Sequence, residues 1–519
     1  MGKRRRKGGG RAARHALRAA TNDTKKSPVQ AGFSGGRYRP LTDEQVVQIH
    51  EMALDVLEKI GMGDPIPELV ELAVAKGCHV NDEGRLCFPK AVMNELIEAA
   101  ASEIVLHGQD PKYDLQVGKE RVHYGTGGAA ITVIDFDTGA YRDSTLADIY
   151  DFARLTDQLD NIHWFTRCVV ATELPDPEEL DVNTAYALVA GTKKHIGTSI
   201  TLPENVAKVT ALFDVVAGGE GEFKKRPFCK LHTSPIVPPL RYGDDAAYTI
   251  VEAIKHNWPI NAITAGQSGA TAPATLAGTL VQTHAETMAA LAFVNLFKPG
   301  HPFIFSNWPF VADLRTGAMT GGSAEGGLLN AAAAQLANYI DVPSGVAGGM
   351  PDSKALDTQA GYERGLPHVM IGLAGANLIY ESGGMLASLL GCSFEAFVVD
   401  NEIVGSALRA VRGIEVTEAT MGYETIAEAV AGPGHFLGAE QTLTVMESEY
   451  LYPDLGDRET PAVWAESGST NIVQRSRTRV KSLMQHYPSY VTPEQDAAIR
   501  AMFDIKLAEG DMRRGNGRW

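Results

Sequence analysis

The side chains best suited to chemistry follow apolar segments that we expect to form strands. Aromatic rings occur beside carboxylic acids at these positions. Such rings and carboxylates are a natural lining for a quaternary ammonium group, because each ring face attracts a cation by roughly 0.5–2 kcal/mol. The candidate residues are Gln267, His284, Glu286, Asn307, Trp308, Glu325, Tyr380 and Glu381, together with His232.

Other chemistries have less support in the sequence. The fourteen histidines include no HExxH or HxH motif, and Cys229 and His232 supply only one thiol and one imidazole on one strand, so we expect no bound metal. No GxGxxG opens a helix after a strand and no GxxxxGK[ST] occurs, so we expect no nucleotide. The five cysteines are scattered, which indicates a reducing compartment.

The elements that must position the candidates recur along the middle of the chain. Short apolar runs alternate there with helix-like stretches, a pattern typical of parallel βα units. Glycine-rich segments follow the fifth, sixth and seventh runs, where a barrel places its active-site loops. Eight such units predict a (β/α)8 barrel over residues 121–412. Its strands are expected near 124–133, 163–171, 195–202, 228–235, 259–267, 303–309, 344–349 and 376–383.

The segments beside this barrel have different patterns. Residues 41–120 predict a cap that begins with a helix, for which Thr42 and Gln45 form a capping box. Apolar residues follow that box at helical spacing up to Ile60. Two further helices and a hairpin through Cys87 complete the cap. Residues 413–519 mix helix and loop, and we expect them to wrap the barrel as a helical extension.

Charge is unevenly distributed along the 519 residues. Residues 1–40 contain twelve of the 47 Lys and Arg but one of the 63 acidic residues, which leaves 35 basic against 62 acidic residues elsewhere. The basic arm predicts a disordered, solubilising tail, with contact to an acidic protein partner as the alternative. The acidic charge of the residues beyond 40 argues against binding of nucleic acid. No apolar run approaches the roughly 20 residues of a membrane span, so we expect a cytoplasmic protein.

Several ordered blocks resemble the trimethylamine methyltransferase family of corrinoid methyltransferases. They are AGTLVQTHAE (277–286), DLRTGAMTGGSAEGGLLNAAAAQLANY (313–339), SGVAGGMPDSKALDTQAGYE (344–363), LAGANLIY (373–380) and VVDNEI (398–403). The resemblance implies a (β/α)8 barrel that moves a methyl group from a methylated amine to the cob(I)amide of a separate corrinoid protein. It also implies a catalytic role for Glu286, and an oligomer like those of relatives.

One position in these blocks separates the chain from part of the family. Archaeal trimethylamine enzymes carry pyrrolysine after a Val-Ala-Gly sequence, and the same block here reads Val346, Ala347, Gly348 and Gly349. Gly349 therefore takes the pyrrolysine position, and we place it in the catalytic site, where it is expected to leave room for a substrate or a corrin. The resemblance is then closer to bacterial members without pyrrolysine, some of which demethylate glycine betaine.

The chemistry of the methyl donor predicts which substrate class suits an enzyme with glycine at position 349. A quaternary amine already carries a neutral tertiary amine as its leaving group. It therefore needs no activation by an electrophilic side chain, the role that pyrrolysine is thought to have for tertiary amines. We therefore expect a quaternary amine, glycine betaine or a similar betaine, as the methyl donor. A pyrrolysine-free tertiary amine demethylase and a non-catalytic quaternary-amine binding protein are the alternatives.

Overall fold

The protein contains a closed barrel of eight parallel strands. The computed structural model describes residues 27–488 and 490–519. Neighbouring strands are hydrogen-bonded in sequence order, β20 pairs with β6, and a parallel bridge between Gly125 and Trp164 joins the β6 segment to β9. The predicted (β/α)8 fold is confirmed. The strands are β6 (Arg121–Tyr124), β9 (Trp164–Thr166), β10 (His195–Thr198), β11 (Cys229–Thr233), β14 (Ile260–Thr264), β16 (Phe303–Asn307), β19 (Ser344–Ala347) and β20 (Leu378–Tyr380).

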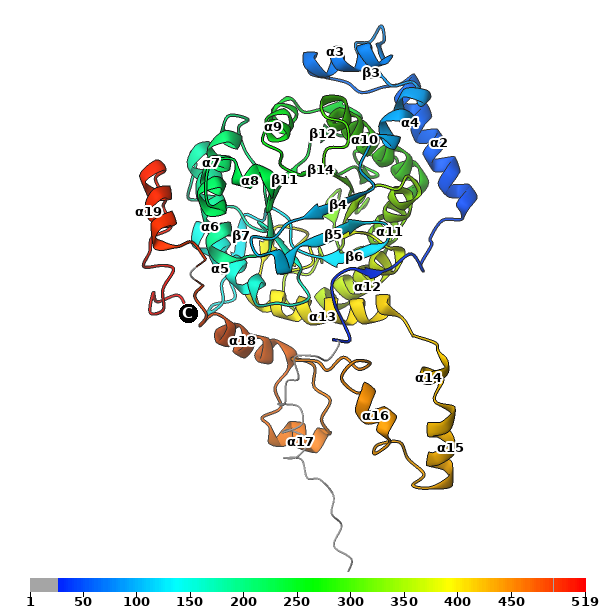
Figure 1. The fold of residues 1–519 in the computed structure, drawn as a ribbon, viewed down its shortest axis with the longest axis vertical. Coiled ribbons are helices and arrows are strands. Elements are labelled where there is room, and N and C mark those ends of the chain that lie inside the picture. Colours follow the sequence, from blue (N-terminus) through cyan, green and yellow to red (C-terminus); the bar gives the residue numbers. More distant parts are fainter. Residues whose placement is uncertain (1–26, 489) are drawn as a thin grey trace, which may run out of the picture. The chain divides into compact units, whose positions relative to one another are not determined.

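One long helix follows each strand, and these helices surround the barrel (Figure 1). Neighbours in this ring pack against each other, as α5 does on α6 and α11 on α12. The helices are α5 (Leu146–Asp157), α6 (Pro177–Gly191), α7 (Asn205–Ala217), α9 (Asp244–Lys255), α10 (Leu276–Phe297), α11 (Ala324–Tyr339), α12 (Thr358–Ala374) and α13 (Phe394–Arg412). A short helix, α8 (Glu222–Lys225), lies between α7 and β11.

Side chains that alternate along the strands fill the barrel, and a hairpin packs against them. Ile304, Leu378 and Tyr380 belong to one buried cluster with Leu106 and Val117 of the hairpin. That hairpin consists of β4 (Glu103–Leu106) and β5 (Leu115–Gly118), with a short 3-10 turn (Pro111–Tyr113) between them. The barrel is therefore a packed core in which only polar side chains near the strand ends remain for chemistry.

Short strands in the connections that follow the barrel strands add three small sheets. β12 (Ile236–Val237) pairs with β13 (Arg241–Tyr242). β15 (Gln267–Ser268), β17 (Phe310–Ala312) and β18 (Met319–Thr320) form a second sheet, and β21 (Met385–Leu386), β22 (Gly391–Cys392), β7 (Thr132–Ile134) and β8 (Tyr141–Asp143) a third. All of these segments lie at the end of the barrel where active sites of this architecture occur.

The N-terminal cap follows the predicted pattern. Helix α2 (Asp43–Lys59) begins with the capping box of Thr42 and Gln45, and its apolar face packs on α10 and α11 through a buried cluster. The cap continues with α3 (Pro67–Lys76), β2 (His79–Val80), β3 (Leu86–Cys87) and α4 (Lys90–Glu98). Ile60 is an exception, because it follows the last helical residue and is 48% exposed.

Ordered structure begins earlier than we expected. The sequence predicted a disordered arm to residue 40, but β1 (Phe33–Ser34) pairs antiparallel with β6. Gly32 N donates a hydrogen bond to the carbonyl of Val122 in that strand, and Gly35 N to the carbonyl of Glu120, the residue before it. The segment therefore extends the barrel sheet, a pairing that two residues without a periodic pattern could not reveal. Residues 1–26 of the predicted arm lie outside the described residues.

The region expected as one C-terminal extension divides into two parts. Residues 453–519 belong to the compact unit that contains the barrel, where α18 (Ile472–Leu483) packs on α13 and α19 (Pro493–Met502) on α7. α17 (Pro461–Glu466) precedes them. Residues 414–452 are grouped in a second unit and form α14 (Glu418–Met421), α15 (Tyr423–Ala431) and α16 (Glu440–Val445). Across the described residues, no helix is both long and apolar enough to span a membrane.

Candidate active site

Aromatic rings gather inside the barrel near the strand ends. The Trp308 ring lies 5.7 Å from the ring of His232 and 5.2 Å from that of Tyr380, measured between centroids. His232 and Tyr380 are 5.4 Å apart, and Trp164 lies 5.1 Å from Tyr380. Three of the predicted substrate-binding residues therefore come together, and Trp164, which the sequence analysis missed, joins them. We call these four residues the aromatic group.

Hydrogen bonds fix the orientation of His232. Asn261 Oδ1 accepts from the hydroxyls of Tyr380 (3.0 Å) and Ser306 (2.5 Å), so the other end of this amide must be its NH2 group. That NH2 donates to Nδ1 of His232 (2.9 Å). Burial, followed by the nearby charge of Lys230, lowers the pKa of His232 far below its usual range. The imidazole is therefore neutral and carries its proton on Nε2, where it is a hydrogen-bond donor.

Glu381 is a buried carboxylic acid at the end of β20. Neither carboxylate oxygen has a hydrogen-bond partner among the described residues, and both lie against the Gly127–Gly128 turn that follows β6. Its backbone is left-handed, with φ 61°, a conformation that costs a side-chain-bearing residue free energy. Burial raises the pKa of Glu381 to about 8. The acid is therefore protonated near neutral pH and adds no negative charge beside the aromatic group.

Stability measurements can test this protonation state. Because the pKa of Glu381 is about 8 in the folded protein and near 4.5 when unfolded, the folded state holds the extra proton between those values. The free energy of unfolding should thus fall as pH rises from about 5 to 8, with a contribution from this group on the order of a few kcal/mol. We expect Glu381→Gln to lose less of its melting temperature than the wild type between pH 5.5 and pH 8. Equal losses would mean that Glu381 is ionised in the fold.

Gly349 lies directly against Glu381, but not in the way we expected. A Cβ atom at this position would overlap the backbone carbonyl oxygen of Glu381 and lie 3.0 Å from the His368 ring. The expectation that Gly349 leaves room for a substrate or a corrin is therefore wrong. Main chain that follows β20 fills the space instead, and this was invisible in the sequence because it depends on how the ends of β19 and β20 approach each other.

Two cationic residues near the aromatic group were missed by the sequence analysis. Lys230 is fully buried, its Nζ has no hydrogen-bond partner among the described residues, and it lies 5.3 Å from the Trp164 ring and 5.6 Å from the Tyr380 ring. Burial lowers the pKa of Lys230 to about 7. Arg167, one residue beyond β9, is half-buried, and its Nη1 has no hydrogen-bond partner in the part of the chain that the structure describes. A lysine inside the apolar run 228–235 was the one indication that the sequence offered.

Three other predicted residues lie at or beyond the ends of the barrel strands, without a recorded contact to the aromatic group. Asn307 is buried and neither atom of its amide is hydrogen-bonded within the described chain. Gln267 is half-buried in β15, beside Phe310 of β17. Glu286 is buried on α10, where one carboxylate oxygen accepts from Leu240 N (2.9 Å) and from Gln282 (3.0 Å).

The remaining predicted residues are not brought to the aromatic group. His284 is hydrogen-bonded to His50 of α2 (3.1 Å) and packs 5.5 Å from Phe305, whose neighbours Ile304 and Ser306 face the barrel interior. It therefore lies between the strands and the outer helices, and we remove it from the candidate site. Glu325 is exposed in the first turn of α11. Neither residue could be assigned to a face from the sequence, because buried side chains surround both helices.

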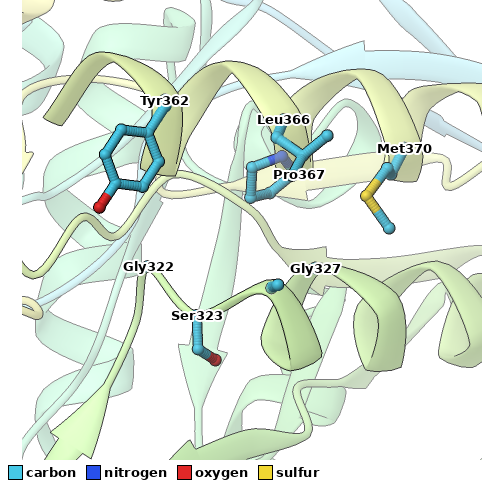
Figure 2. Close-up of a pocket in the computed structure, with 8 residues that line it drawn as sticks. Gly322, Ser323, Gly327, Tyr362, Leu366, Pro367 and Met370 are labelled. Atoms are coloured by element: carbon cyan, nitrogen blue, oxygen red, sulfur yellow. The ribbon is translucent and has the colours of Figure 1, made fainter. Parts of the chain in front are cut away.

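A small apolar pocket lies between the beginning of α11 and the length of α12 from Tyr362 to Met370, outside the barrel. Figure 2 shows Tyr362, Leu366 and Met370 of α12 on one side and the turn around Ser323 on the other. Its volume is about 90 Å³ and its lining contains no acid or base. It therefore offers no catalytic group. Within the described part of the chain, no cluster of three or more His, Cys, Asp or Glu side chains could hold a metal ion.

Comparison with known proteins identifies the family of this chain. The family described as trimethylamine methyltransferase (MTTB) matches residues 6–510. The chain is 32% identical to trimethylamine methyltransferase MttB of Desulfitobacterium hafniense (strain DSM 10664 / DCB-2), over 91% of this chain and 95% of that protein. It is 28% identical to a glycine betaine methyltransferase of D. hafniense (strain Y51), over 90% and 96% of the two chains. A solved structure, the monomethylamine methyltransferase of Methanosarcina barkeri, is similar with a TM-score of 0.48 and 14% identity, over 86% and 95%. The chain belongs to the trimethylamine methyltransferase family and is a corrinoid-dependent methyltransferase.

Proposed function

We propose that this enzyme transfers a methyl group from a quaternary amine to a corrinoid carried by a separate protein. The observation that carries the proposal is the aromatic group, beside which the buried acid Glu381 holds its proton. Trp308, Tyr380 and Trp164 supply ring faces for a cation, and Glu381, the carboxylic acid that follows Tyr380 in the chain, keeps its proton. A quaternary ammonium group is attracted by rings and needs no carboxylate.

The charge change during transfer explains why this lining suits the reaction. The corrinoid, when bound, supplies a cobalt nucleophile that accepts the methyl group. The nitrogen begins as a cation and leaves as a neutral tertiary amine, so an ionised carboxylate would stabilise the substrate more than the transition state. Rings attract the cation more weakly than an ion pair would. A protonated Glu381 avoids that penalty, and no residue has to donate a proton to the leaving nitrogen.

The apolar surface around the entrance of the barrel suits a partner protein that carries a large flat group. Exposed apolar side chains come from segments that follow barrel strands: Leu314 is 69% exposed, Leu390 61% and Tyr362 61%. They belong to the β17–β18 turn, the β21–β22 turn and the beginning of α12. Apolar side chains exposed around an active-site entrance are typical of a docking surface. We propose that the corrinoid protein binds these residues.

Methyl transfer to free cob(I)alamin tests the proposed function. The full chain is mixed with reduced corrinoid and one candidate donor, and the absorbance of the corrinoid reports methylation. We expect glycine betaine or another quaternary amine to react and trimethylamine to be inactive. Reaction with trimethylamine alone would establish a tertiary amine enzyme. Binding of a quaternary amine without any transfer would establish a binding protein.

Glu286 gives a second test, because we propose that it is catalytic. Its Oε2 has no partner among the described residues, and burial raises its pKa to about 7. We expect Glu286→Gln, measured by initial rates of methyl transfer at pH 7.5, to lower turnover at least tenfold. The amide keeps the shape of the side chain, so the melting temperature should change little. Gln282→Ala, which removes one hydrogen bond to Glu286, is the control and should lower turnover by less. Wild-type rates for Glu286→Gln would mean that this residue only supports Leu240.

A further inference from the structure

A buried ion pair lies beside the segment that follows β20. Arg364 of α12 and Asp400 of α13 are 1% and 0% exposed, and Arg364 Nε lies 3.1 Å from Asp400 Oδ1. These two atoms are not aligned for a hydrogen bond. Charges that are withdrawn from water carry a desolvation cost that their mutual attraction often fails to offset. Stabilisation of the fold alone therefore does not explain the pair.

Both side chains also bind the main chain after β20. Asp400 Oδ2 accepts from Gly384 N (2.7 Å), and Arg364 Nη2 donates to the carbonyl oxygen of Met385. The pair thus binds both ends of one dipeptide. Gly384 has a left-handed backbone, with φ 79°, and glycine main chain has wide conformational freedom. The two hydrogen bonds therefore restrict a segment whose sequence would otherwise allow many conformations.

This segment carries Glu381 and lies against the turn that follows β6. A Cβ atom added at Gly128 would lie 2.9 Å from Glu381 Oε2 and 2.7 Å from Met385 Cε. A Cβ atom added at Gly127 would lie 2.8 Å from Glu381 Oε1 and 3.2 Å from the Tyr380 ring. The Glu381 carboxyl therefore shares this turn with Met385 and with one ring of the aromatic group.

We infer that the Arg364–Asp400 pair positions this segment for methyl transfer. The pair holds Glu381 and Met385 against the Gly127–Gly128 turn and so keeps water from the Glu381 carboxyl. Burial raises the pKa of this acid to about 8, so entry of water would let it ionise. An ionised carboxylate would stabilise a cationic substrate more than the transition state. The inference rests on the proposed quaternary amine reaction, and it gives the pair an effect on turnover rather than on binding.

A double variant separates positioning from stability. Arg364→Met with Asp400→Leu replaces the ion pair by apolar side chains, a change that often leaves stability unchanged or raises it. With glycine betaine and free cob(I)alamin, its turnover at saturating substrate should fall at least tenfold. Its KM for glycine betaine should stay within about twofold or decrease, because an ionised Glu381 attracts the cation. Arg364→Lys keeps the charge and a donor, and it should retain most of the turnover.

Thermal unfolding gives a readout that does not depend on the substrate. In the wild-type background, Glu381→Gln should reduce the loss of melting temperature between pH 5.5 and pH 8, because the buried acid releases its extra proton there. In the double variant, Glu381 should already be ionised over this range, so Glu381→Gln should have no effect on the loss. Burial also raises the pKa of Asp400, to about 6, and comparison within each background removes that contribution.

Glu402→Leu is the matched control. Glu402 lies on α13 with Asp400 and accepts from the main-chain nitrogens of Asp454, Leu455 and Gly456 (2.9, 2.6 and 2.8 Å). Its loss frees main chain elsewhere, so the melting temperature should fall while turnover and KM stay unchanged.

Three results would overturn the inference. They are wild-type turnover in the double variant, a rise in KM that parallels the loss of turnover, and an effect of Glu381→Gln that persists in the double variant. If the wild type demethylates no quaternary amine, the proposed function fails, and the thermal comparison alone decides whether the pair shields Glu381.

Discussion

Replacing Gly349 with alanine is expected to reduce methyl transfer at least tenfold and to lower the melting temperature. The new methyl group would overlap the carbonyl oxygen of Glu381, and main chain cannot move aside as a flexible side chain can. Overpacking of this kind typically costs about 1–3 kcal/mol. Relief of the overlap requires the segment after β20 to shift, and this shift would displace Tyr380 and Glu381 together. Initial rates with free cob(I)alamin and thermal unfolding measure the two effects.

The control for this change is Gly361→Ala. Gly361 lies in α12, and a Cβ atom there would meet nothing within 4 Å. Alanine is the better helix former by roughly 1 kcal/mol, so this variant should be as stable as the wild type or more stable, with unchanged turnover. Full activity of Gly349→Ala would show that the ends of β19 and β20 separate easily. The site could then accept a side chain at this position after all.

The barrel could be predicted because its pattern repeats. Seven of the eight predicted ranges contain the observed strand, whereas the first, 124–133, overlaps β6 only at Tyr124; α2 begins at the capping box that the sequence indicated. Local chemistry determines such features, since an apolar run or a cap requires only neighbouring residues. β1 has no such local pattern, because Phe33–Ser34 becomes a strand only through its pairing with β6.

The site could be predicted only in part, because it depends on which way each side chain faces. Trp308 follows β16 and Tyr380 ends β20, and both do face the interior. His284 lies in α10, which is buried nearly all round, so periodicity could not show that it faces His50. Lys230 was overlooked inside an apolar run. Its meaning appears only when the register of β11 with β10 places Lys230 opposite Gly197, beside the Trp164 ring.

Packing also changes the interpretation of Gly349. The sequence marks it as the position of an absent pyrrolysine, and donor chemistry leads from there to quaternary amines. The structure places Glu381 main chain where a side chain would begin, beside an acid that burial keeps protonated. One contact between the strand ends thus leaves no space for a side chain at Gly349 and lies beside a protonated acid.

Trp308→Ala is expected to weaken quaternary amine binding by about tenfold, with turnover at low substrate falling in proportion. Trp308 is 4% exposed and its ring lies near both His232 and Tyr380, so its loss removes one ring face and one donor from the site. Removal of one ring costs roughly 0.5–2 kcal/mol of cation attraction, which corresponds to a loss of up to about thirtyfold. Trp308→Phe keeps a ring and should lose less affinity.

A large core truncation also destabilises the fold, so Trp308→Ala needs a control that loses stability elsewhere. Trp258 is fully buried against Phe213 and Phe223, and its indole donates to Thr210 (2.9 Å). Trp258→Ala should lower the melting temperature by a comparable amount, because both changes remove a buried indole. Its affinity for the quaternary amine should stay within twofold of the wild type. If both variants lose affinity equally, Trp308 acts through stability and the cation is held elsewhere. If only Trp308→Ala loses affinity, the ring contacts the ligand, because loss of packing is common to both.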